Sequence, residues 1–398
     1  MSGRIKVLYL AGTDPRDTSY GGAQRTHFIW EGLKKVAEVY TVIPVGRKSL
    51  ERVDDVDRIR WFCFGHRFTP GWFFNRIWCL VFPRIGLACG VHSLDWAVRQ
   101  MPVHPDFCVT RYVYMASRFQ VWRVAPLVID VDDLESEVFD TLNQQGQTFA
   151  HRLVRKVICA YENRIVGKAD HVWVVNPAHL HHVSARTVLP NISAGGKPDF
   201  SSVLGDADTL LFVGHGFSSP NYEGLDRFLD RHWAELRRDF PFLKLKIVGR
   251  GYPNAFTEKW QQYSGVQLFG FVEDLFALYR DSLCAINPVE IGSGSCIKTI
   301  EALSYGRVCV TTVSGARGLP NESGIGVFQF TDTFDLRSIL TSIRDPTFRI
   351  EAQQQARDYA FRQHSQDVID EAVKLTMQVM LSKPRTEQEN HAGSEKIF

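Results

Sequence analysis

The sequence lacks the features that mark several common protein classes. Its eight cysteines show neither CxxC nor histidine-rich spacing, so we predict no structural zinc and no disulfide framework. The first apolar run is too short for a signal peptide, and the best membrane-spanning candidate, residues 77–90, is interrupted by Pro83 and Arg84. The net charge of +2 gives no reason to expect nucleic-acid binding. We therefore expect a cytoplasmic globular protein with free thiols.

Short apolar runs alternate with amphipathic stretches along most of the chain, which predicts an α/β fold with parallel sheets. A stretch rich in Gly, Ser, Pro and Asp separates two series of this alternation. The expected units are an N-terminal Rossmann-like domain (1–192), a linker (193–207), a C-terminal Rossmann-like domain (208–363), a helix that packs back on the first domain (about 364–382) and a disordered tail (383–398).

The segment 286–306, INPVEIGSGSCIKTIEALSYG, has the composition of a phosphate site. Four small residues separate an apolar strand from a predicted helix: Gly292, Ser293, Gly294 and Ser295. Helix N-termini attract anions, and Lys298 in the first turn adds a full positive charge. Glu301 follows on the same face, where its carboxylate can accept hydrogen bonds from ribose hydroxyls. A nucleotide diphosphate fits this pattern, and the alternative is an ordinary capped helix with a surface Lys–Glu pair.

Further segments accompany this motif in a specific order. They are YGGAQRTHFIWEGL (20–33), VLPNI (188–192), LLFVGHGFSSPNYEGLDRFLDRHW (210–233) and LKLKIVGRG (243–251). Together with the G-x-G-x-x-x-K-x-x-E pattern at 292–301, they make residues 4–375 resemble glycosyltransferase family 4. The resemblance implies a GT-B fold, with two Rossmann-like domains facing each other across a cleft. The N-terminal domain would hold the acceptor and the C-terminal domain the nucleotide sugar.

The resemblance also implies roles for individual residues. Lys298 would bind the diphosphate as a catalytic group, Glu301 the ribose, and residues 292–295 the phosphates. The other positions on the donor side would be Gly21, Gly22, His215, Asn221, Arg250, Phe271 and Val272. Arg25 would add charge near the phosphates, and it lies with Arg111 on the acceptor side. The chain departs from the family at Ser293, where many members have glutamate, and at His215, where many have arginine.

The acidic segment LVIDVDDLES (127–136) has three interpretations. Asp130 and Asp132 have the D-x-D form of a metal site. Asp132 and Asp133 follow a strand and would orient or deprotonate an acceptor hydroxyl as catalytic groups. Asp132 and Glu135 also have the form of a helix capping box. We expect no metal and no other cofactor.

The activity implied by the resemblance is transfer of a hexose from a nucleotide diphosphate sugar, with retention, to a hydroxyl of a glycan or lipid-linked glycan. This reaction belongs to cell-envelope or extracellular polysaccharide biosynthesis. A GT-B nucleotide-sugar epimerase and a non-catalytic sugar-nucleotide-binding subunit are the alternatives. The aromatic and Arg-rich segment 60–86 either meets an anionic membrane at its cytoplasmic face or forms a domain core.

Overall fold

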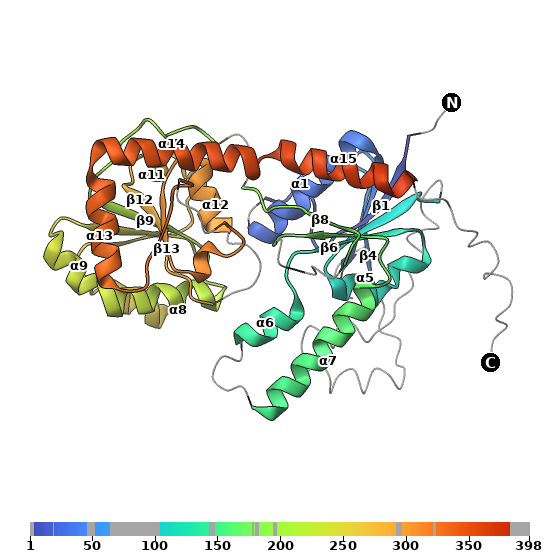
Figure 1. Ribbon diagram of the computed structural model, residues 1–398, viewed down its shortest axis with the longest axis horizontal. Coiled ribbons are helices and arrows are strands. Elements are labelled where there is room, and N and C mark those ends of the chain that lie inside the picture. The colour runs from blue at the N-terminus through green and yellow to red at the C-terminus, as the bar shows by residue number, and fades with distance from the viewer. Residues whose placement is uncertain are drawn as a thin grey trace.

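The computed structural model describes residues 4–18, 20–45, 52–63, 104–142, 148–176, 179, 183–193, 197–291, 297–320 and 324–382. Two sheets lie side by side, each flanked by helices, and α14 and α15 run across both halves (Figure 1). The predicted α/β class with two parallel sheets is confirmed. Of the segment 60–86 only residues 60–63 are described, and the predicted tail, 383–398, lies outside the described residues.

The first sheet contains eight strands in the order β3-β4-β2-β1-β5-β6-β7-β8. All neighbours are parallel except the pair β3 and β4. The strands are β1 (Lys6–Leu10), β2 (Glu38–Val45), β3 (Arg52–Asp54), β4 (Ile59–Cys63), β5 (Phe107–Arg111), β6 (Leu127–Val131), β7 (His171–Val174) and β8 (Arg186–Val188).

The second sheet contains six strands, all parallel, in the order β11-β10-β9-β12-β13-β14. Its strands are β9 (Thr209–Val213), β10 (Lys244–Val248), β11 (Val266–Phe269), β12 (Cys284–Asn287), β13 (Cys309–Thr311) and β14 (Val327–Gln329).

The α-helices connect these strands and cover both faces of each sheet (Figure 1). They are α1 (Gly21–Val36), α5 (Val113–Phe119), α6 (Glu135–Leu142), α7 (Phe149–Val166), α8 (Ser219–Phe228), α9 (Ala234–Asp239), α10 (Asn254–Trp260), α11 (Phe276–Arg280), α12 (Ile297–Ser304), α13 (Thr333–Arg344), α14 (Pro346–Gln363) and α15 (Gln366–Ser382). Among the described residues, no helix combines the length and apolar character that crossing a membrane requires.

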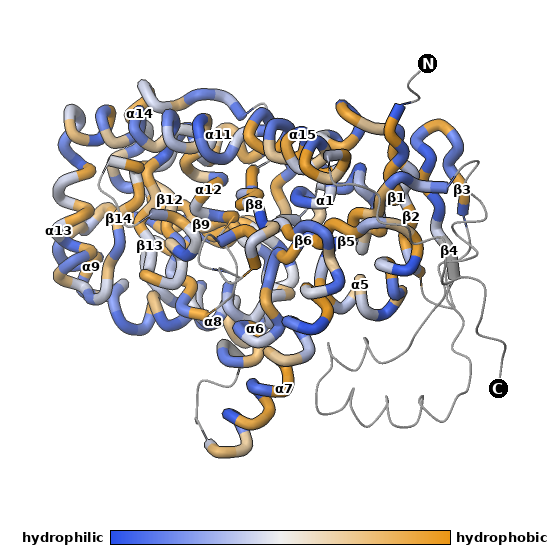
Figure 2. Tube along the Cα trace, turned by 45° about the vertical axis from the view of Figure 1, so that its right-hand side comes forward, coloured by the Kyte–Doolittle hydropathy of each residue, from blue (hydrophilic) through white to orange (hydrophobic). Residues whose placement is uncertain are grey.

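The continuous apolar runs of the central strands reflect burial on both faces, as expected for parallel sheet. Side chains alternate in direction along a strand, so β1 places Leu8 and Leu10 in one core and Val7 and Tyr9 in the other. Figure 2 shows hydrophobic residues along central strands such as β5 and β12, inside an outer layer richer in hydrophilic residues.

The last helix, α15, completes the core of the N-terminal sheet. Ile369, Val373 and Met377 pack against β1 and α1 residues, and the indole of Trp173 donates a hydrogen bond of 2.9 Å to the hydroxyl of Thr376. The crossing between α14 and α15 is fixed at His364, whose ring lies 2.7 Å from the carbonyl oxygen of Asn191. The chain therefore returns to its first domain after finishing its second.

Strand order reverses at one point in each sheet, and this positions the candidate site. The chain builds outward from β1 through β2 to β4, and then continues on the other side of β1 with β5, β6 and β7. It repeats this pattern around β9, first to β10 and β11 and then to β12, β13 and β14. Ligands of such folds bind beyond the carboxyl ends of the strands at these reversals. The segments after β1, β5, β9 and β12 therefore form the candidate site.

Candidate donor and acceptor site

Lys298 lies beside the segment that follows β9. It occupies the first turn of α12, and a Cβ atom built on Gly214 would lie 3.0 Å from its Cε atom. The Lys298 side chain therefore runs along the carboxyl edge of the second sheet, where an anion would also meet the N-terminus of α12. The predicted phosphate loop, Gly292, Ser293, Gly294 and Ser295, lies outside the described residues.

The segment after β9 is held by close backbone packing. The Gly216 amide donates to the carbonyl of Arg250 at 2.8 Å, and the Tyr252 hydroxyl donates to the carbonyl of Gly214 at 2.5 Å. A Cβ atom on Gly216 would lie 2.2 Å from the backbone nitrogen of Tyr252, so no larger residue fits there. Glycine at this position is needed for close approach of two loops.

Asn221 requires a correction. We predicted that it contacts the donor, but it is only 3% exposed and its amide nitrogen donates to the carbonyl of His215 at 2.8 Å. Its physical role is to hold the segment after β9 in place. Asn221 therefore acts through His215 and its neighbours instead of presenting its own side chain to a ligand.

The pKa of His215 reflects its burial and the positive charge near it. Its pKa is lowered, first because the ring is half-buried and second because the charge of Lys298 lies nearby. Both causes favour the neutral imidazole at neutral pH. The imidazole and the lysine thus occupy the same end of the second sheet.

We expect the pKa of His215 to rise when UDP binds, because diphosphate charge offsets that of Lys298 and favours the imidazolium form. An NMR titration of the histidine ring protons with and without UDP measures the shift, and His215→Gln identifies the resonance. His364 provides the control, since burial lowers its pKa to about 4 and it lies at the α14–α15 crossing. An unchanged His215 pKa at saturating UDP would place the diphosphate elsewhere.

Glu301 is fixed by a partner that the sequence did not indicate. It lies one turn after Lys298 on α12, is 9% exposed, and accepts a hydrogen bond of 2.9 Å from the Tyr279 hydroxyl. The Tyr279 ring stacks on Tyr305 at 4.2 Å, and the amine of Lys197 donates to the Tyr305 hydroxyl at 2.9 Å. This chain of contacts sets the orientation of the Glu301 carboxylate.

The predicted nucleobase residues lie on the rim of the second sheet. The guanidinium of Arg250 stands 5.1 Å from the centre of the exposed Phe271 ring, a cation–π geometry, and Val272 is half-buried beside it. Arg250 and Phe271 follow β10 and β11, which are neighbours in the sheet. The structure therefore brings these residues together at the carboxyl edge.

The two domains touch at the N-termini of α1 and α12. A Cβ atom on Gly21 would lie 3.0 Å from the Cδ1 atom of Ile297, the residue directly before Lys298. Gly22 follows, and its carbonyl accepts a hydrogen bond from Arg111. The positive ends of two helices thus meet across the domain boundary, close to Lys298.

Arg25 and Arg111 require a second correction. We predicted that both face the acceptor side, with Arg25 near the phosphates, but each is 2% exposed. Arg25 binds the fully buried Asp130 through two nitrogens and donates to the Leu189 carbonyl at 3.0 Å. Arg111 bonds to Asp130 at 3.2 Å and Asp132 at 2.5 Å. Both guanidinium groups are therefore occupied by the buried Asp130 and the partly exposed Asp132 and are not available to a ligand.

The same network separates the interpretations of the acidic segment. Asp130 is buried between two arginines, which removes one of the two carboxylates that the D-x-D metal site needs. In the described part of the chain no cluster of three His, Cys, Asp or Glu side chains has a metal-binding arrangement. The backbone amides of Glu135 and Ser136, at the start of α6, donate hydrogen bonds to the carboxylate of Glu162, at 2.5 Å for Glu135. The N-terminus of α6 is therefore capped by a residue of α7. Asp132 stays partly exposed beside the half-buried Asp133 at the end of β6.

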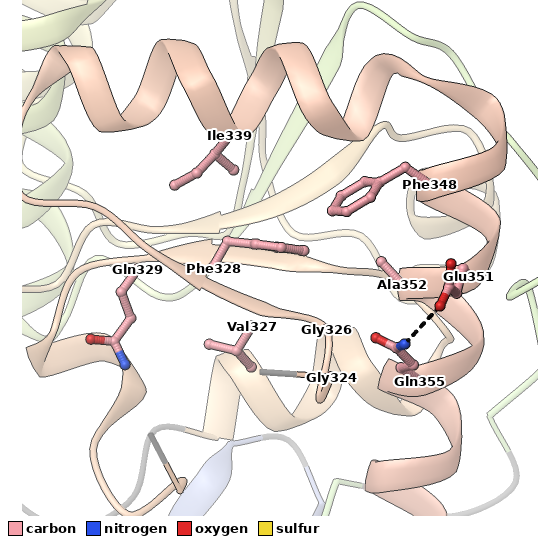
Figure 3. Close-up of a pocket in the computed structure, with 10 residues that line it drawn as sticks. All are labelled: Gly324, Gly326, Val327, Phe328, Gln329, Ile339, Phe348, Glu351, Ala352 and Gln355. Atoms are coloured by element: carbon pink, nitrogen blue, oxygen red, sulfur yellow. Dashed lines mark hydrogen bonds between the residues drawn. The ribbon is translucent and has the colours of Figure 1, made fainter. Parts of the chain in front are cut away.

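A cavity of about 470 Å³ lies elsewhere, along the edge strand β14. Figure 3 shows Ile339 from α13 and Phe348 from α14 pointing toward Phe328, with Glu351 and Gln355 hydrogen-bonded to each other. Its glycines, Gly324 and Gly326, precede β14, so the cavity reaches the amino end of the strand, away from the ligand-binding edge. It offers no cation for a diphosphate.

Two Rossmann-like domains with parallel sheets, meeting at their carboxyl edges, define the GT-B fold, and solved structures confirm it. Sucrose-phosphate synthase from Thermosynechococcus elongatus is similar with a TM-score of 0.65 and 14% identity, over 96% of this chain and 100% of that one. WaaG, a glycosyltransferase involved in lipopolysaccharide biosynthesis, gives 0.60 and 15% over 94% and 99%. HepE from Anabaena, solved with UDP and glucose, gives 0.59 and 13% over 94% and 99%.

Comparison with protein-family models gives a match for most of the second domain. Residues 207–334 match the family model described as glycosyl transferases group 1. The chain spans 55% of the length of TarM, to which it is similar with a TM-score of 0.54 over 70% of its own length. No curated protein matches the chain by sequence. The matched segment contains Lys298, Glu301, His215 and Arg250.

Proposed function

We propose that this protein is a retaining hexosyltransferase of the family 4 type, which transfers a hexose from a nucleotide diphosphate sugar to a glycan or lipid-linked glycan hydroxyl. The observation that carries the proposal is the position of Lys298 and Glu301. They lie one turn apart on α12, beside Gly214, within the segment that matches glycosyl transferases group 1. A cation for the diphosphate and a carboxylate for the ribose are thus held at one sheet edge.

In the proposed reaction the bond between the sugar C1 and the diphosphate oxygen breaks as the acceptor oxygen bonds to C1 from the same face. Lys298 and the N-terminus of α12 stabilise the charge that develops on the leaving diphosphate. Asp132, held by Arg111 at 2.5 Å, orients the acceptor hydroxyl, and the proton of that hydroxyl passes to the carboxylate of the neighbouring Asp133. The proposed mechanism uses no metal, because Lys298 and the N-terminus of α12 stabilise the charge on the diphosphate.

The first donor to test is a UDP-hexose. HepE, which shares the fold, has been solved with UDP and with UDP-glucose. The test incubates the protein with UDP-, GDP-, ADP- and dTDP-sugars, measures the released nucleotide, and determines the anomeric configuration of the product by NMR. Transfer with retained configuration supports the proposal. An inverted product contradicts the retaining mechanism, and interconversion of donor sugars without an acceptor indicates an epimerase.

A binding subunit without catalysis is the second candidate, and Ser293 and His215 favour it. They stand where many family 4 members have glutamate and arginine, so the phosphate site carries fewer charged groups. Donor binding by calorimetry separates this candidate from the first. Tight binding of a nucleotide sugar with no release of nucleotide under a panel of acceptors would select the binding subunit.

Replacing Glu301 with alanine is expected to weaken binding of the donor about 10- to 100-fold, because a charged group would lose its hydrogen bonds to ribose. Calorimetry with UDP and with its dideoxyribose analogue measures this effect. The analogue should bind the wild type as weakly as UDP binds the variant, with no further loss when both changes are combined. Tyr279→Phe should give a smaller loss, since it removes only the hydrogen bond that orients Glu301.

The control for this experiment is Glu351→Ala, which removes an exposed glutamate from α14. It should leave the affinity for UDP unchanged. If Glu301→Ala and Glu351→Ala bind UDP equally well, Glu301 does not contact the ribose.

For the pathway, the proposed role is cell-envelope or extracellular polysaccharide biosynthesis at the cytoplasmic face of a membrane.

A further inference from the structure

One half of α7 projects from the N-terminal domain. The helix packs into the domain through Ile158, Glu162, Ile165 and Val166, all of which lie in its second half. No residue from 149 to 157 is buried. Figure 1 shows α7 extending away from both sheets, with its N-terminal end farthest from them. The first half of the helix thus has an outer face that no described part of the chain buries.

This projecting half carries an apolar stripe. Phe149 is 78% exposed, Leu153 55% and Val157 48%, and they follow each other at intervals of four residues. Residues at this spacing lie on one side of a helix. That side is opposite the packed residues, because Ile158 and Glu162 are about half a turn away from Phe149 and Leu153. Three exposed apolar side chains on one stripe indicate a contact surface.

Basic residues flank the stripe. Between positions 149 and 168 they are Arg152, Arg155, Lys156, Arg164 and Lys168. The only acidic residue in this range is Glu162, which is buried. Arg155 pairs with Asp140 at 2.5 Å, whereas the other four basic residues form no ion pair within the described part of the chain. The exposed face of α7 therefore combines the apolar stripe with two basic residues, Arg152 and Lys156, that lie along one side of it.

We propose that this face, the α7 surface (Phe149, Leu153 and Val157 with Arg152 and Lys156), docks on an anionic lipid bilayer. The apolar stripe enters the boundary between headgroups and acyl chains, and the cations contact lipid phosphates. A second copy of the chain fits poorly, since two α7 surfaces would bring like charges together. A nucleic acid would leave the apolar stripe without a partner.

The position of α7 adds a functional consequence that rests on the proposed function. α7 crosses between the parallel strands β6 and β7, so it runs against their direction and its N-terminal end lies toward their carboxyl edge. Asp132 and Asp133 occupy that edge. Docking through the α7 surface therefore brings the bilayer to the acceptor side of the site, where a lipid-linked acceptor is held.

The test is co-sedimentation of the full chain with vesicles of phosphatidylcholine alone and of phosphatidylcholine with phosphatidylglycerol in equal parts. We expect binding to the anionic vesicles only, weakened by added salt. Arg152→Gln with Lys156→Gln should reduce partitioning about 25-fold, since each base near the surface contributes roughly fivefold. Phe149→Ser with Leu153→Ser and Val157→Ser should reduce it at least about tenfold.

A matched control removes the same three residue types from exposed positions on α14 and α15. The variant Phe361→Ser, Leu375→Ser and Val379→Ser changes a face that carries Glu371 and should bind vesicles like the wild type. Absence of binding by the wild type, or equal binding by the α7 and control variants, overturns the proposal. A wild-type dimer that the α7 variants convert to monomer would assign the surface to a second copy. Unchanged UDP affinity in all variants keeps this outcome separate from the donor site.

Discussion

Replacing Lys298 with alanine is expected to lower kcat/KM for sugar transfer about 100- to 1,000-fold, the range seen when one group that stabilises a developing oxyanion is removed. The Lys298 side chain is only partly buried and packs along Gly214, so its removal leaves no large cavity. The melting temperature should therefore fall by less than about 2 °C. Initial rates with a UDP-sugar, combined with a melting curve, measure both quantities.

The size of this effect follows from what remains in the site. In the described residues at this edge, Lys298 carries the positive charge beside the segment after β9, because Arg25 and Arg111 are buried in pairs with Asp130 and Asp132. The N-terminus of α12 adds only a partial charge. Losing Lys298 thus removes a full positive charge from the first turn of α12, beside the segment after β9.

Two further variants show whether the effect belongs to this position. Lys298→Arg keeps the charge but changes its shape, and we expect about tenfold loss in kcat/KM. Lys374→Ala removes an exposed lysine of α15 and should leave the rate unchanged. A rate for Lys298→Ala equal to that for Lys374→Ala would contradict the assignment of Lys298 to the diphosphate.

Replacing Arg25 with methionine is expected to cost about 3–5 kcal/mol of unfolding free energy, because it leaves a buried carboxylate short of its partner. Arg25 binds Asp130 through two nitrogens and also bonds to Leu189 and Asn191, all inside the domain. Methionine has a side chain of similar length, so most of the lost unfolding free energy should come from the missing charge pair and little from a change in volume. Urea unfolding followed by circular dichroism gives the free energy.

The exposed Arg16 provides the contrast. It pairs with Asp14 and Asp54 near the surface, so Arg16→Met should cost less than about 1 kcal/mol. Adding Asp130→Asn to Arg25→Met should recover part of the stability, because it removes the uncompensated charge. Equal losses for Arg25→Met and Arg16→Met would show that the buried network contributes no more than a surface ion pair.

The fold was predictable because parallel strands buried on both faces leave continuous apolar runs in the sequence. The apolar segment KVLYL forms β1, and the amphipathic segment Phe149–Val166 forms α7. The placement of Lys298 and Glu301 on one helix was predictable for a similar reason, since residues three positions apart lie on the same face of a helix. Local periodicity therefore carries both the architecture and this part of the candidate site.

The rest depended on contacts between distant residues. An arginine in the first helix has the same local sequence whether it faces a ligand or a buried aspartate, and the partner of Arg25 lies 105 positions away. Asn221 likewise had the position expected of a ligand contact, and only tertiary packing buried it. Tyr279 belongs to no motif, and its bond to Glu301 joins two helices. Such pairings are set by the assembled sheets.

The return of α15 to the first domain affects how the protein is made. The N-terminal sheet begins at residue 6, yet its core still lacks Ile369, Val373 and Met377 when most of the chain has left the ribosome. The second domain gains its last strand by residue 329 and its core helices α13 and α14 by residue 363, so it is complete before α15 is made. A premature stop codon before position 366 would remove α15 and leave the core of the N-terminal domain incomplete. The apolar surface that α15 covers would then be exposed to chaperones and proteases.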